Sequence, residues 1–587
     1  MGKNIVITGE GIVSAIGSDK DSVLNSLRRN KTGIGEMKYL KSSHHELPVG
    51  EVKLSNEEMK AMLGFGASEM ISRTTMMGML AVGQAIEEAK LARQQGLRIV
   101  LVNGTTVGGM DITEQYFETF TDSDKYIGCL KAHDCGSCTQ MIAERFGIFD
   151  DSTTISTACS SAANALILGA NLIKAGEADI VVAGGCEALT RFHLNGFNSL
   201  MILDGEQCKP FDDKRAGLNL GEGAAFVVLE SEELARQRNA SIHAYLTGYG
   251  NACDAYHQTA TSDNGQGAFL AMKDALEMAY LSPEEIDYVN AHGTGTPNND
   301  QTESVALQRV FGDFIPKVSS TKSFTGHTTS ASGSIEAVIC LLAMNNSFVP
   351  ANIGWKNPMN NGIIPTMGAE GCELNHVMCN SFGFGGNDSS IILSSRPLHD
   401  DIKDVYADVE IHEVSRVEIT NEDQLCALRN YVKPLEIRRM GKIIKSSLLS
   451  SLQALEQAGI ECPDAIITAT SLGCLENSER LLVQLHEEGE VMLKPTYFMQ
   501  STHNTISSNI AIHTKCHGYN ITYTHGNQSF EWALRDAKML LRSGKVRSVL
   551  VGLHDETTVM WRSFMERMER KDLLPIHSIA IVLTCGR

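Results

Sequence analysis

The segment STACSSAANAL places Cys159 between a strand-like run and a predicted helix that begins near Ser160. At a helix N-terminus, exposed backbone N–H groups and the helix dipole stabilise an anion and lower the pKa of a thiol. The sequence therefore predicts that Cys159 is a thiolate nucleophile. The alternative is a buried cysteine packed as a small apolar side chain, and its neighbours decide between the two.

Two histidines lie in loops of small polar residues. His292 stands in NAHGTGTPNND and His327 in KSFTGHTTSASG, each just after an apolar segment. A histidine at the end of a parallel strand can reach a cleft at the carboxyl edge of the sheet. Taken singly, each is better explained as a structural loop residue, so the inference rests on the combination with Cys159.

Metal-binding patterns are missing around these residues. The sequence has no HxxxH spacing beside the two histidines, and the CxxC of Cys135 and Cys138 has no second pair. We interpret Cys135 and Cys138 as a packed or incidental pair. The sequence predicts no metal site and no cofactor.

The composition is that of a folded globular protein, with 20% charged and 43% hydrophobic residues in 587. A formal net charge of −20 argues against nucleic acid or anionic membrane as a general partner. The longest apolar run, residues 335–344, is about half as long as a bilayer requires, so we expect no membrane span. With scattered cysteines and no signal-peptide pattern, we expect a cytoplasmic protein with reduced thiols.

Short β-branched runs alternate with longer amphipathic segments, which is typical of a parallel sheet with crossover helices. The strand-like runs are residues 4–8, 99–102 and 180–183, and the helical ones are 21–29, 76–92 and 162–174. We therefore predict an α/β fold.

The chain also contains a repeat. The pattern of residues 76–117 returns from Arg439, and that of 153–188 returns from Tyr519. The copy has no counterpart of residues 234–397, so it is half a module. The predicted domains are residues 1–397, with halves of about 1–233 and 234–397, a linker at 398–408, and a truncated copy at 409–587.

Cys159, the two histidine loops, KPFDDKRAGLNLGEGAA and NSFGFGGNDSSIIL together resemble the β-ketoacyl-acyl-carrier-protein synthases of the thiolase superfamily. The resemblance covers residues 1 to about 397, in order and spacing. It implies a thiolase-like layered α/β/α/β/α fold, to which residues 409–587 add a fused thiolase-like half-domain.

The resemblance also implies a reaction. Cys159 would take an acyl chain from a carrier-protein thioester, and malonyl carrier protein would then enter. His292 and His327 would hold the malonyl thioester oxygen, so that loss of CO₂ leaves a stabilised enolate. Its attack on the acyl thioester would give 3-oxoacyl carrier protein. Acyl- and malonyl-loaded acyl carrier proteins are the implied partners.

Supporting roles follow from the same resemblance. The backbone N–H groups of Cys159 and Phe384 would hold the tetrahedral oxyanion, and Lys322 would orient its loop and charge, with Glu303 as partner. Phe382 and Phe384 would line or gate the pocket, with core packing as the alternative for either ring. The chain departs from the family where Asn387 and Asp388 replace Thr-Asn after two glycines, and where residues 330–333 replace Gly-Ala-Ala-Gly.

In the copy, His525 is predicted to occupy the position equivalent to Cys159, and no residues equivalent to His292 or His327 are found. The copy therefore cannot condense. It resembles the inactive chain-length-factor partners of type II polyketide and aryl-polyene synthases, which implies an internal pseudo-dimer and leaves higher oligomers open.

Two groups of residues in the copy are candidates for further roles. Tyr497, Phe498 and Met499 would lie near the tunnel floor and limit chain length, or would simply be interface core. A basic stretch is a docking candidate for acidic carrier proteins, with a solvated helix face as the alternative. It contains Lys433, Arg438, Arg439, Lys442 and Lys445.

We expect a decarboxylative condensing enzyme, an acyltransferase, of aryl-polyene or other type II polyketide synthesis. Fatty acid elongation is one alternative. A scaffold that loads a chain without extending it is another, and a synthase that uses coenzyme A thioesters is a third.

Overall fold

The computed structural model describes residues 3–93, 95–123, 125–397, 406, 409–491, 493–568 and 574–586. The predicted linker at 398–408 lies outside the described residues, apart from Tyr406. Among the residues described, no helix is both long and apolar enough to cross a membrane.

Residues up to 397 form two five-stranded groups within one sheet. The order of the first group is β3-β2-β4-β5-β1, and that of the second is β6-β12-β11-β7-β8. The strands are β1 (Ile5–Ser14), β2 (Ile99–Gly104), β3 (Asp151–Ile155), β4 (Ile180–Glu187), β5 (Gly223–Ser231), β6 (Ala244–Cys253), β7 (Tyr288–Asn290), β8 (Lys317–Ser319), β11 (His376–Gly383) and β12 (Asn387–Ser394). β9 (Phe348–Val349) and β10 (Ala369–Glu370) pair separately.

Two helices form the central layer between these groups. α6 (Ser161–Lys174) packs on β4 and β2, and α12 (Ser332–Asn345) packs on β5 and β11. Nearly every residue of both helices is buried, and most of their side chains are apolar or small, as expected for helices enclosed between two sheets. This confirms the predicted α/β/α/β/α layering.

The outer layers cover the other faces of the two groups. α3 (Arg73–Glu88) and α5 (Cys135–Phe146) pack on the first group and on each other, and α9 (Gln266–Ala279) packs on the second beside α10 (Pro297–Phe311). The remaining helices of this part are α1 (Lys20–Arg28), α2 (Asn56–Leu63), α4 (Met110–Asp122), α7 (Arg191–Ser199), α8 (Glu232–Gln237) and α11 (Lys322–Thr325).

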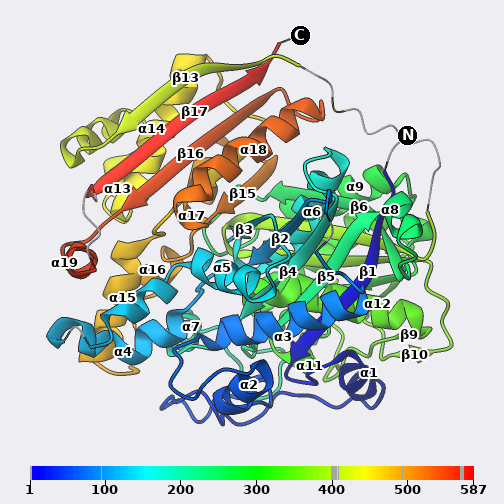
Figure 1. Cartoon of the computed structure of the whole chain (residues 1–587). Coiled ribbons are helices and arrows are strands. Elements are labelled where there is room, and N and C mark those ends of the chain that lie inside the picture. Colours follow the sequence, from blue (N-terminus) through cyan, green and yellow to red (C-terminus); the bar gives the residue numbers. More distant parts are fainter. Residues whose placement is uncertain are drawn as a thin grey trace.

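Residues 409–586 extend the same sheet (Figure 1). Their strands are β13 (Ile411–Ile419), β14 (Ala465–Ala469), β15 (Tyr519–Tyr523), β16 (Ser548–Glu556) and β17 (Ile576–Cys585), in the order β13-β17-β16-β14-β15. Their helices are α13 (Pro434–Ile437), α14 (Lys442–Ala458), α15 (Leu475–Glu487), α16 (Pro495–Met499), α17 (Thr505–Thr514), α18 (Ser529–Arg542) and α19 (Val559–Arg567). We call residues 3–397 the first part and 409–586 the second part.

The two parts meet edge to edge. β15 pairs antiparallel with β3 at Tyr523 and Ile155, so the strand order on one side of this contact mirrors that on the other. The Ser156 N–H donates to the Thr522 carbonyl (2.9 Å), and the Thr524 N–H donates to the Thr154 carbonyl (3.0 Å). The second part therefore covers a sheet edge that would otherwise expose unpaired backbone groups.

The structure corrects the register of the repeat. The Thr157 N–H donates to Ser161 Oγ at 2.9 Å, and the His525 N–H donates to Ser529 Oγ at 2.7 Å. His525 is therefore equivalent to Thr157, and the residue equivalent to Cys159 is Asn527, which is exposed. The error was two positions. Gly526, with φ +54°, is equivalent to Ala158, with φ +50°, so the glycine marks the turn in the copy.

Candidate active site

Cys159 lies on the turn between β3 and α6, in the short 3₁₀ segment Ala158–Ser160. Ala158 adopts φ +50°, a left-handed conformation uncommon for residues other than glycine. Such strained backbone is often found where a side chain must be aimed at a functional site. The Cys159 side chain is buried, as expected for a reaction shielded from water.

The structure brings Cys159, His292 and His327 together. His327 Nε2 lies 3.1 Å from Cys159 Sγ, and His327 Nδ1 lies 3.0 Å from Ser332 Oγ. The ring centroids of His292 and His327 are 5.3 Å apart, and the two ring planes are nearly perpendicular. Residues from distant segments thus converge at the carboxyl ends of the strands, where open α/β sheets hold ligands.

His292 is held by its backbone rather than by its ring. Glu303 accepts the N–H groups of His292 (2.8 Å) and Gly293 (2.7 Å). Within the described residues, His292 Nδ1 is buried and has no hydrogen-bond partner. A buried polar atom left unpaired is costly, so the position of this ring is fixed by its backbone contacts and its packing rather than by a hydrogen bond at Nδ1.

Lys322 is buried, and its ammonium forms an ion pair with Glu336 of α12. The expectation that Glu303 is its ion-pair partner is wrong, because the Glu303 carboxylate instead accepts hydrogen bonds from the backbone N–H groups of His292 and Gly293. Burial raises the pKa of Glu336 to about 7, although the Lys322 charge and its hydrogen bond lower it.

The electrostatics of Cys159 differ from the expectation of a preformed thiolate. Burial raises the pKa of the Cys159 thiol to about 11, although the nearby Lys322 charge and the Phe384 backbone N–H both lower it. Burial also holds the pKa values of His292 and His327 well below the usual range, with Lys322 contributing. Desolvation outweighs the helix dipole here, so the resting pair is a thiol beside a neutral imidazole.

This protonation state predicts how Cys159 responds to pH. The thiolate is the reactive form, so its alkylation by iodoacetamide should accelerate about tenfold per pH unit between about pH 7 and pH 9. The rate would be followed by intact mass, with peptide mapping to Cys159. A pH-independent rate over this range would show a preformed thiolate–imidazolium pair and contradict the assignment.

The turn after β11 completes the centre. The Phe384 N–H points to the Cys159 sulfur, so two backbone donors, those of Cys159 and Phe384, face the reacting position. Phe382 lies beside His292 with ring centroids 5.8 Å apart, and the Phe384 ring stacks on Phe197 at 5.6 Å.

A metal could in principle use the same donors. One ligand atom each of Cys159, His292 and His327 lies within 4.8 Å of the others. However, the Lys322 ammonium acts on all three side chains and would repel a cation placed between them. This donor set therefore suits an anionic reaction centre better than a metal.

The second part reaches this centre through Asn504, which sequence reasoning missed. Asn504 Nδ2 donates to the Phe384 carbonyl (2.7 Å) and to Asn387 Oδ1 (2.6 Å). Asn387 in turn donates to Asn520 Oδ1 (2.9 Å). No local signal identifies Asn504, because its partners are more than a hundred residues away in the sequence.

A cavity of about 280 Å³, which we call the interface cavity, lies between the two parts. Its walls include Thr106, His133, Phe192, Phe498, His503 and Trp561. His503 Nδ1 lies 3.0 Å from Ser156 Oγ, three residues before Cys159. His193 also lines the cavity and is close enough to His327 to lower its pKa. The cavity thus lies next to the reaction centre.

The three chain-length candidates differ in burial and in surroundings. The Phe498 ring is buried against Phe197 (5.1 Å) and Phe192 (6.1 Å) of the first part and lines the interface cavity. Tyr497 is half-buried beneath the cations of Arg480 and Lys494, and Met499 is half-buried.

The five basic candidates differ in solvent exposure and in ion pairing. Lys433, Arg438 and Arg439 are exposed around α13, whereas Lys445 is half-buried. Lys442 forms an ion pair with Glu422 (2.8 Å). Only three of the five cations are therefore presented to solvent.

The sequence matches family models in three places. Residues 2–235 match the N-terminal domain of β-ketoacyl synthase, and residues 243–356 match its C-terminal domain. Residues 412–585 match a further β-ketoacyl synthase N-terminal domain model. The 3-oxoacyl-[acyl-carrier-protein] synthase 2 of Vibrio cholerae is 32% identical over 420 residues, which are 66% of this chain and 98% of that protein.

Solved structures show the same relationship. The ishigamide ketosynthase/chain length factor is 30% identical, with a TM-score of 0.63 over 68% of this chain and 100% of that chain. The PfaC keto synthase-chain length factor is 16% identical, with a TM-score of 0.82 over 99% of this chain and 78% of that chain. The latter likeness shows the fold alone, and it extends over both parts.

Proposed function

Because this chain belongs to the β-ketoacyl synthase family, we propose that it condenses an acyl group on Cys159 with malonyl carrier protein, giving 3-oxoacyl carrier protein and CO₂. The observation that carries the proposal is the 3.1 Å contact between Cys159 Sγ and His327 Nε2, with the His292 ring centroid 5.3 Å from that of His327.

In the first half-reaction, Cys159 attacks the thioester of an acyl carrier protein. His327 takes the thiol proton at Nε2 as the S–C bond forms, because a neutral imidazole at this distance can act as general base. The carrier thiolate leaves and takes up the proton. The tetrahedral oxyanion lies against the N–H groups of Cys159 and Phe384.

In the second half-reaction, the malonyl thioester oxygen binds between His292 and His327. The bond to the carboxylate breaks, CO₂ leaves, and the electron pair forms an enolate that an imidazole N–H can stabilise. For His327 this requires the tautomer with the proton on Nε2 and with Nδ1 accepting from Ser332 Oγ. The enolate carbon attacks the acyl carbonyl, and the Cys159 thiolate departs and takes up a proton from solvent, which restores the resting thiol. Lys322, held by Glu336, lowers the pKa of this leaving thiol.

We assign the second part a supporting role as an internal replacement for a partner subunit. Its counterpart of Cys159 is Asn527, whose side-chain amide is no nucleophile. It covers the β3 edge and closes the interface cavity. A fused, inactive half supports polyene or other polyketide synthesis over fatty acid elongation as the pathway.

The interface cavity would receive the growing acyl chain, with Phe498 as a wall that limits its length. Phe498→Ala should shift carrier-bound products towards longer chains, because the removed ring opens space at the cavity. It should also lower the free energy of unfolding by about 3–5 kcal/mol. Mass spectrometry of the products and thermal denaturation would measure both effects.

Tyr497→Ala is the matched control, since Tyr497 stands beside Phe498 but lies under surface cations. It should leave the product lengths unchanged. Unchanged lengths in Phe498→Ala, or an equal shift in both variants, would contradict the role of Phe498.

The exposed cations Lys433, Arg438 and Arg439 are the carrier-docking candidates that we retain. Carrier proteins are acidic, and charge complementarity raises association rates more than affinity. Lys442 is already neutralised by Glu422 and is less suited to this role.

The proposal is tested by incubating the protein with acyl- and malonyl-loaded carrier protein and measuring CO₂ and the 3-oxoacyl product. A scaffold would release no CO₂. A coenzyme A-dependent synthase would work equally well without carrier protein. Acyl-enzyme formation with carrier-dependent CO₂ release and product is the result that supports condensation.

A further inference from the structure

The proposed reaction requires two opposite states of His327. In the first half-reaction, Nε2 must accept the proton of the Cys159 thiol, so the proton of the neutral ring has to lie on Nδ1. In the second, Nε2 must donate a hydrogen bond to the malonyl thioester oxygen, so the ring proton has to lie on Nε2. The group that faces Nδ1 therefore decides whether one ring can serve both steps.

That group is the hydroxyl of Ser332, whose Oγ lies 3.0 Å from His327 Nδ1. Ser332 is the first residue of α12, so its position is set by the helix and not by the loop that carries the histidine. A backbone N–H or carbonyl at this place would be compatible with only one tautomer, because the first only donates and the second only accepts. A hydroxyl can do both, by rotation about its C–O bond.

A second hydroxyl lies behind the first. Thr328 Oγ1 is 3.2 Å from Ser332 Oγ, and either oxygen can be the donor. With the ring proton on Nδ1, the hydrogen bonds run from His327 to Ser332 and from Ser332 to Thr328. With the ring proton on Nε2, both bonds run in the opposite direction. Nδ1 and the Ser332 hydroxyl therefore keep their hydrogen-bond partners in either state.

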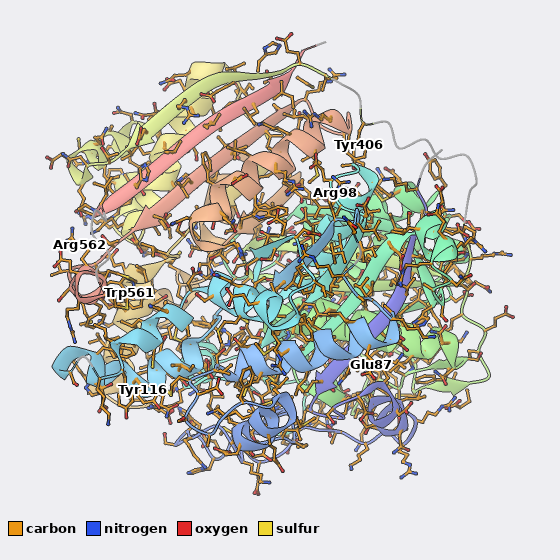
Figure 2. The ribbon with its side chains drawn as sticks, in the orientation of Figure 1. Glu87, Arg98, Tyr116, Tyr406, Trp561 and Arg562 are labelled. Carbon is orange, nitrogen blue, oxygen red and sulfur yellow. The ribbon has the colours of Figure 1, made fainter. Side chains whose placement is uncertain are left out.

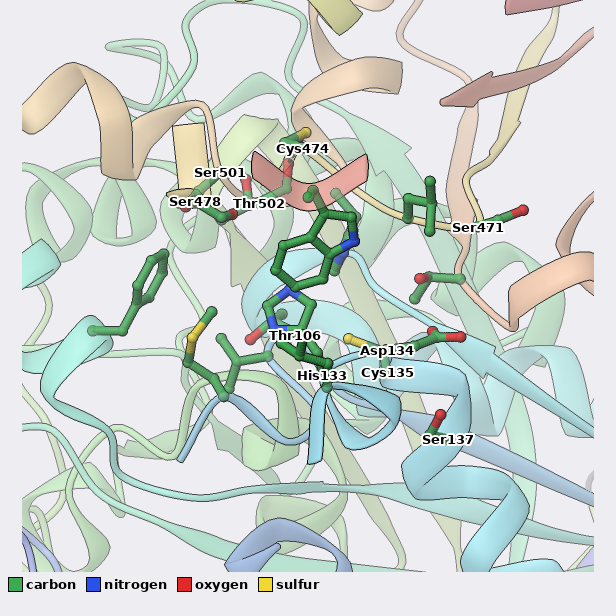
Figure 3. Close-up of a pocket in the computed structure, with 18 of the residues that line it drawn as sticks. Thr106, His133, Asp134, Cys135, Ser137, Ser471, Cys474, Ser478, Ser501 and Thr502 are labelled. Atoms are coloured by element: carbon green, nitrogen blue, oxygen red, sulfur yellow. Dashed lines mark hydrogen bonds between the residues drawn. The ribbon is translucent and has the colours of Figure 1, made fainter. Parts of the chain in front are cut away.

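These three groups lie in the interior of the first part. Thr328, Ser332 and His327 are buried, and side chains fill the spaces between the ribbons around them (Figure 2). The wall of the interface cavity is formed by other residues, including His133 (Figure 3). Burial and the Lys322 charge hold the pKa of His327 well below its usual range, so the resting ring is neutral and its two states differ only in tautomer.

We propose that Ser332 is a positioning residue that holds His327 in a different tautomer for each half-reaction. Its hydroxyl accepts from Nδ1 while Nε2 takes the Cys159 proton, and it donates to Nδ1 while the Nε2–H binds the malonyl oxygen. The change of tautomer removes one proton from Nδ1 and adds one to Nε2, with water as the exchange partner, so the charge of the ring is unchanged. The inference rests on the proposed function, because both half-reactions are steps of it.

Ser332→Ala removes the hydroxyl and introduces the residue that the family pattern Gly-Ala-Ala-Gly has at this position, so the variant should fold. It should slow both half-reactions about tenfold, because Nδ1 loses its partner in each state. Acylation is followed by intact mass with acyl carrier protein. The second half-reaction is followed separately, as CO₂ release in a single turnover of preformed acyl-enzyme with malonyl carrier protein.

Thr328→Val distinguishes control of the tautomer from a general disturbance of the loop. Valine has nearly the shape of threonine, but it leaves Nδ1 as the acceptor for the Ser332 hydroxyl and so favours the tautomer with the proton on Nε2. Acylation should slow about fivefold, and the second half-reaction should keep its rate. Equal losses in both half-reactions would contradict the role of the hydroxyl pair.

Ser334→Ala is the matched control. Ser334 is also a buried serine in the first turn of α12, but its Oγ donates to the Ala331 carbonyl at 3.2 Å. This variant should keep both rates. Thermal denaturation of the three variants shows whether each is folded.

Neutron diffraction from deuterated crystals shows the tautomers directly. The free protein should carry deuterium on His327 Nδ1, because the Cys159 thiol donates to Nε2. The acyl-enzyme has no thiol proton, so it should carry deuterium on Nε2, with the Ser332 hydroxyl directed to Nδ1. The same tautomer in both states would overturn the inference, whatever the variants do.

The kinetic outcomes distinguish this inference from the proposed function. A wild-type protein that does not acylate, or that releases no CO₂ from malonyl carrier protein, contradicts the proposed function. A wild-type protein that does both, beside a folded Ser332→Ala protein with unchanged rates or with only one rate lowered, contradicts the inference alone.

Discussion

Cys159→Ala is expected to lower the rate of condensation by at least about 10³-fold, because no other side chain in the centre can form the acyl thioester. His327 would lose the thiol that it contacts at 3.1 Å, while the backbone donors of the turn would stay in place. The measurement is the rate of 3-oxoacyl product formation, with intact mass to detect acyl-enzyme.

Cys138→Ala is the matched control for this variant. Cys138 is also a buried thiol of the first part, but its sulfur lies 3.7 Å from that of Cys186 rather than beside a histidine. It should form acyl-enzyme and product at near wild-type rates. Product formation by Cys159→Ala at a similar rate would overturn the assignment of the nucleophile.

Asn504→Leu should lower kcat by about 10- to 100-fold with little change in KM for the acyl carrier protein. Asn504 fixes the turn after β11 from the second part by donating to the Phe384 carbonyl and to Asn387. Leucine has a similar volume but no amide. The Phe384 N–H could then move away from the position where the oxyanion develops.

Ser508→Ala tests whether this effect belongs to Asn504 or to the contact as a whole. Ser508 packs against the same turn at Gly385, but its hydroxyl has no hydrogen-bond partner in the described part of the chain. This variant should keep its kcat. An unchanged kcat in a folded Asn504→Leu protein would show that the second part does not position the oxyanion donors.

Asn504 also explains one departure from the family pattern. Asn387 stands where the resemblance predicts threonine, and it bridges Asn504 and Asn520 of the second part. The substitution is therefore part of the contact between the two parts. This could not be inferred from residues 1–397 alone.

Features that depend on neighbouring residues could be predicted from the sequence. The strand-to-helix turn at Cys159, the loops of His292 and His327, and the duplicated half were all predicted from local patterns. The α/β/α/β/α layering followed from the resemblance that these motifs carry. Such features are encoded by short-range periodicity and by glycine-rich turns, which a single sequence displays directly.

Properties that depend on contacts between distant segments emerged only in the folded structure. These include the pairing of Lys322 with Glu336, the raised pKa of Cys159, and the true register of the copy at Asn527. Burial shifts a pKa through the whole environment of a group. That environment is assembled from both parts of the chain, and no local pattern records it.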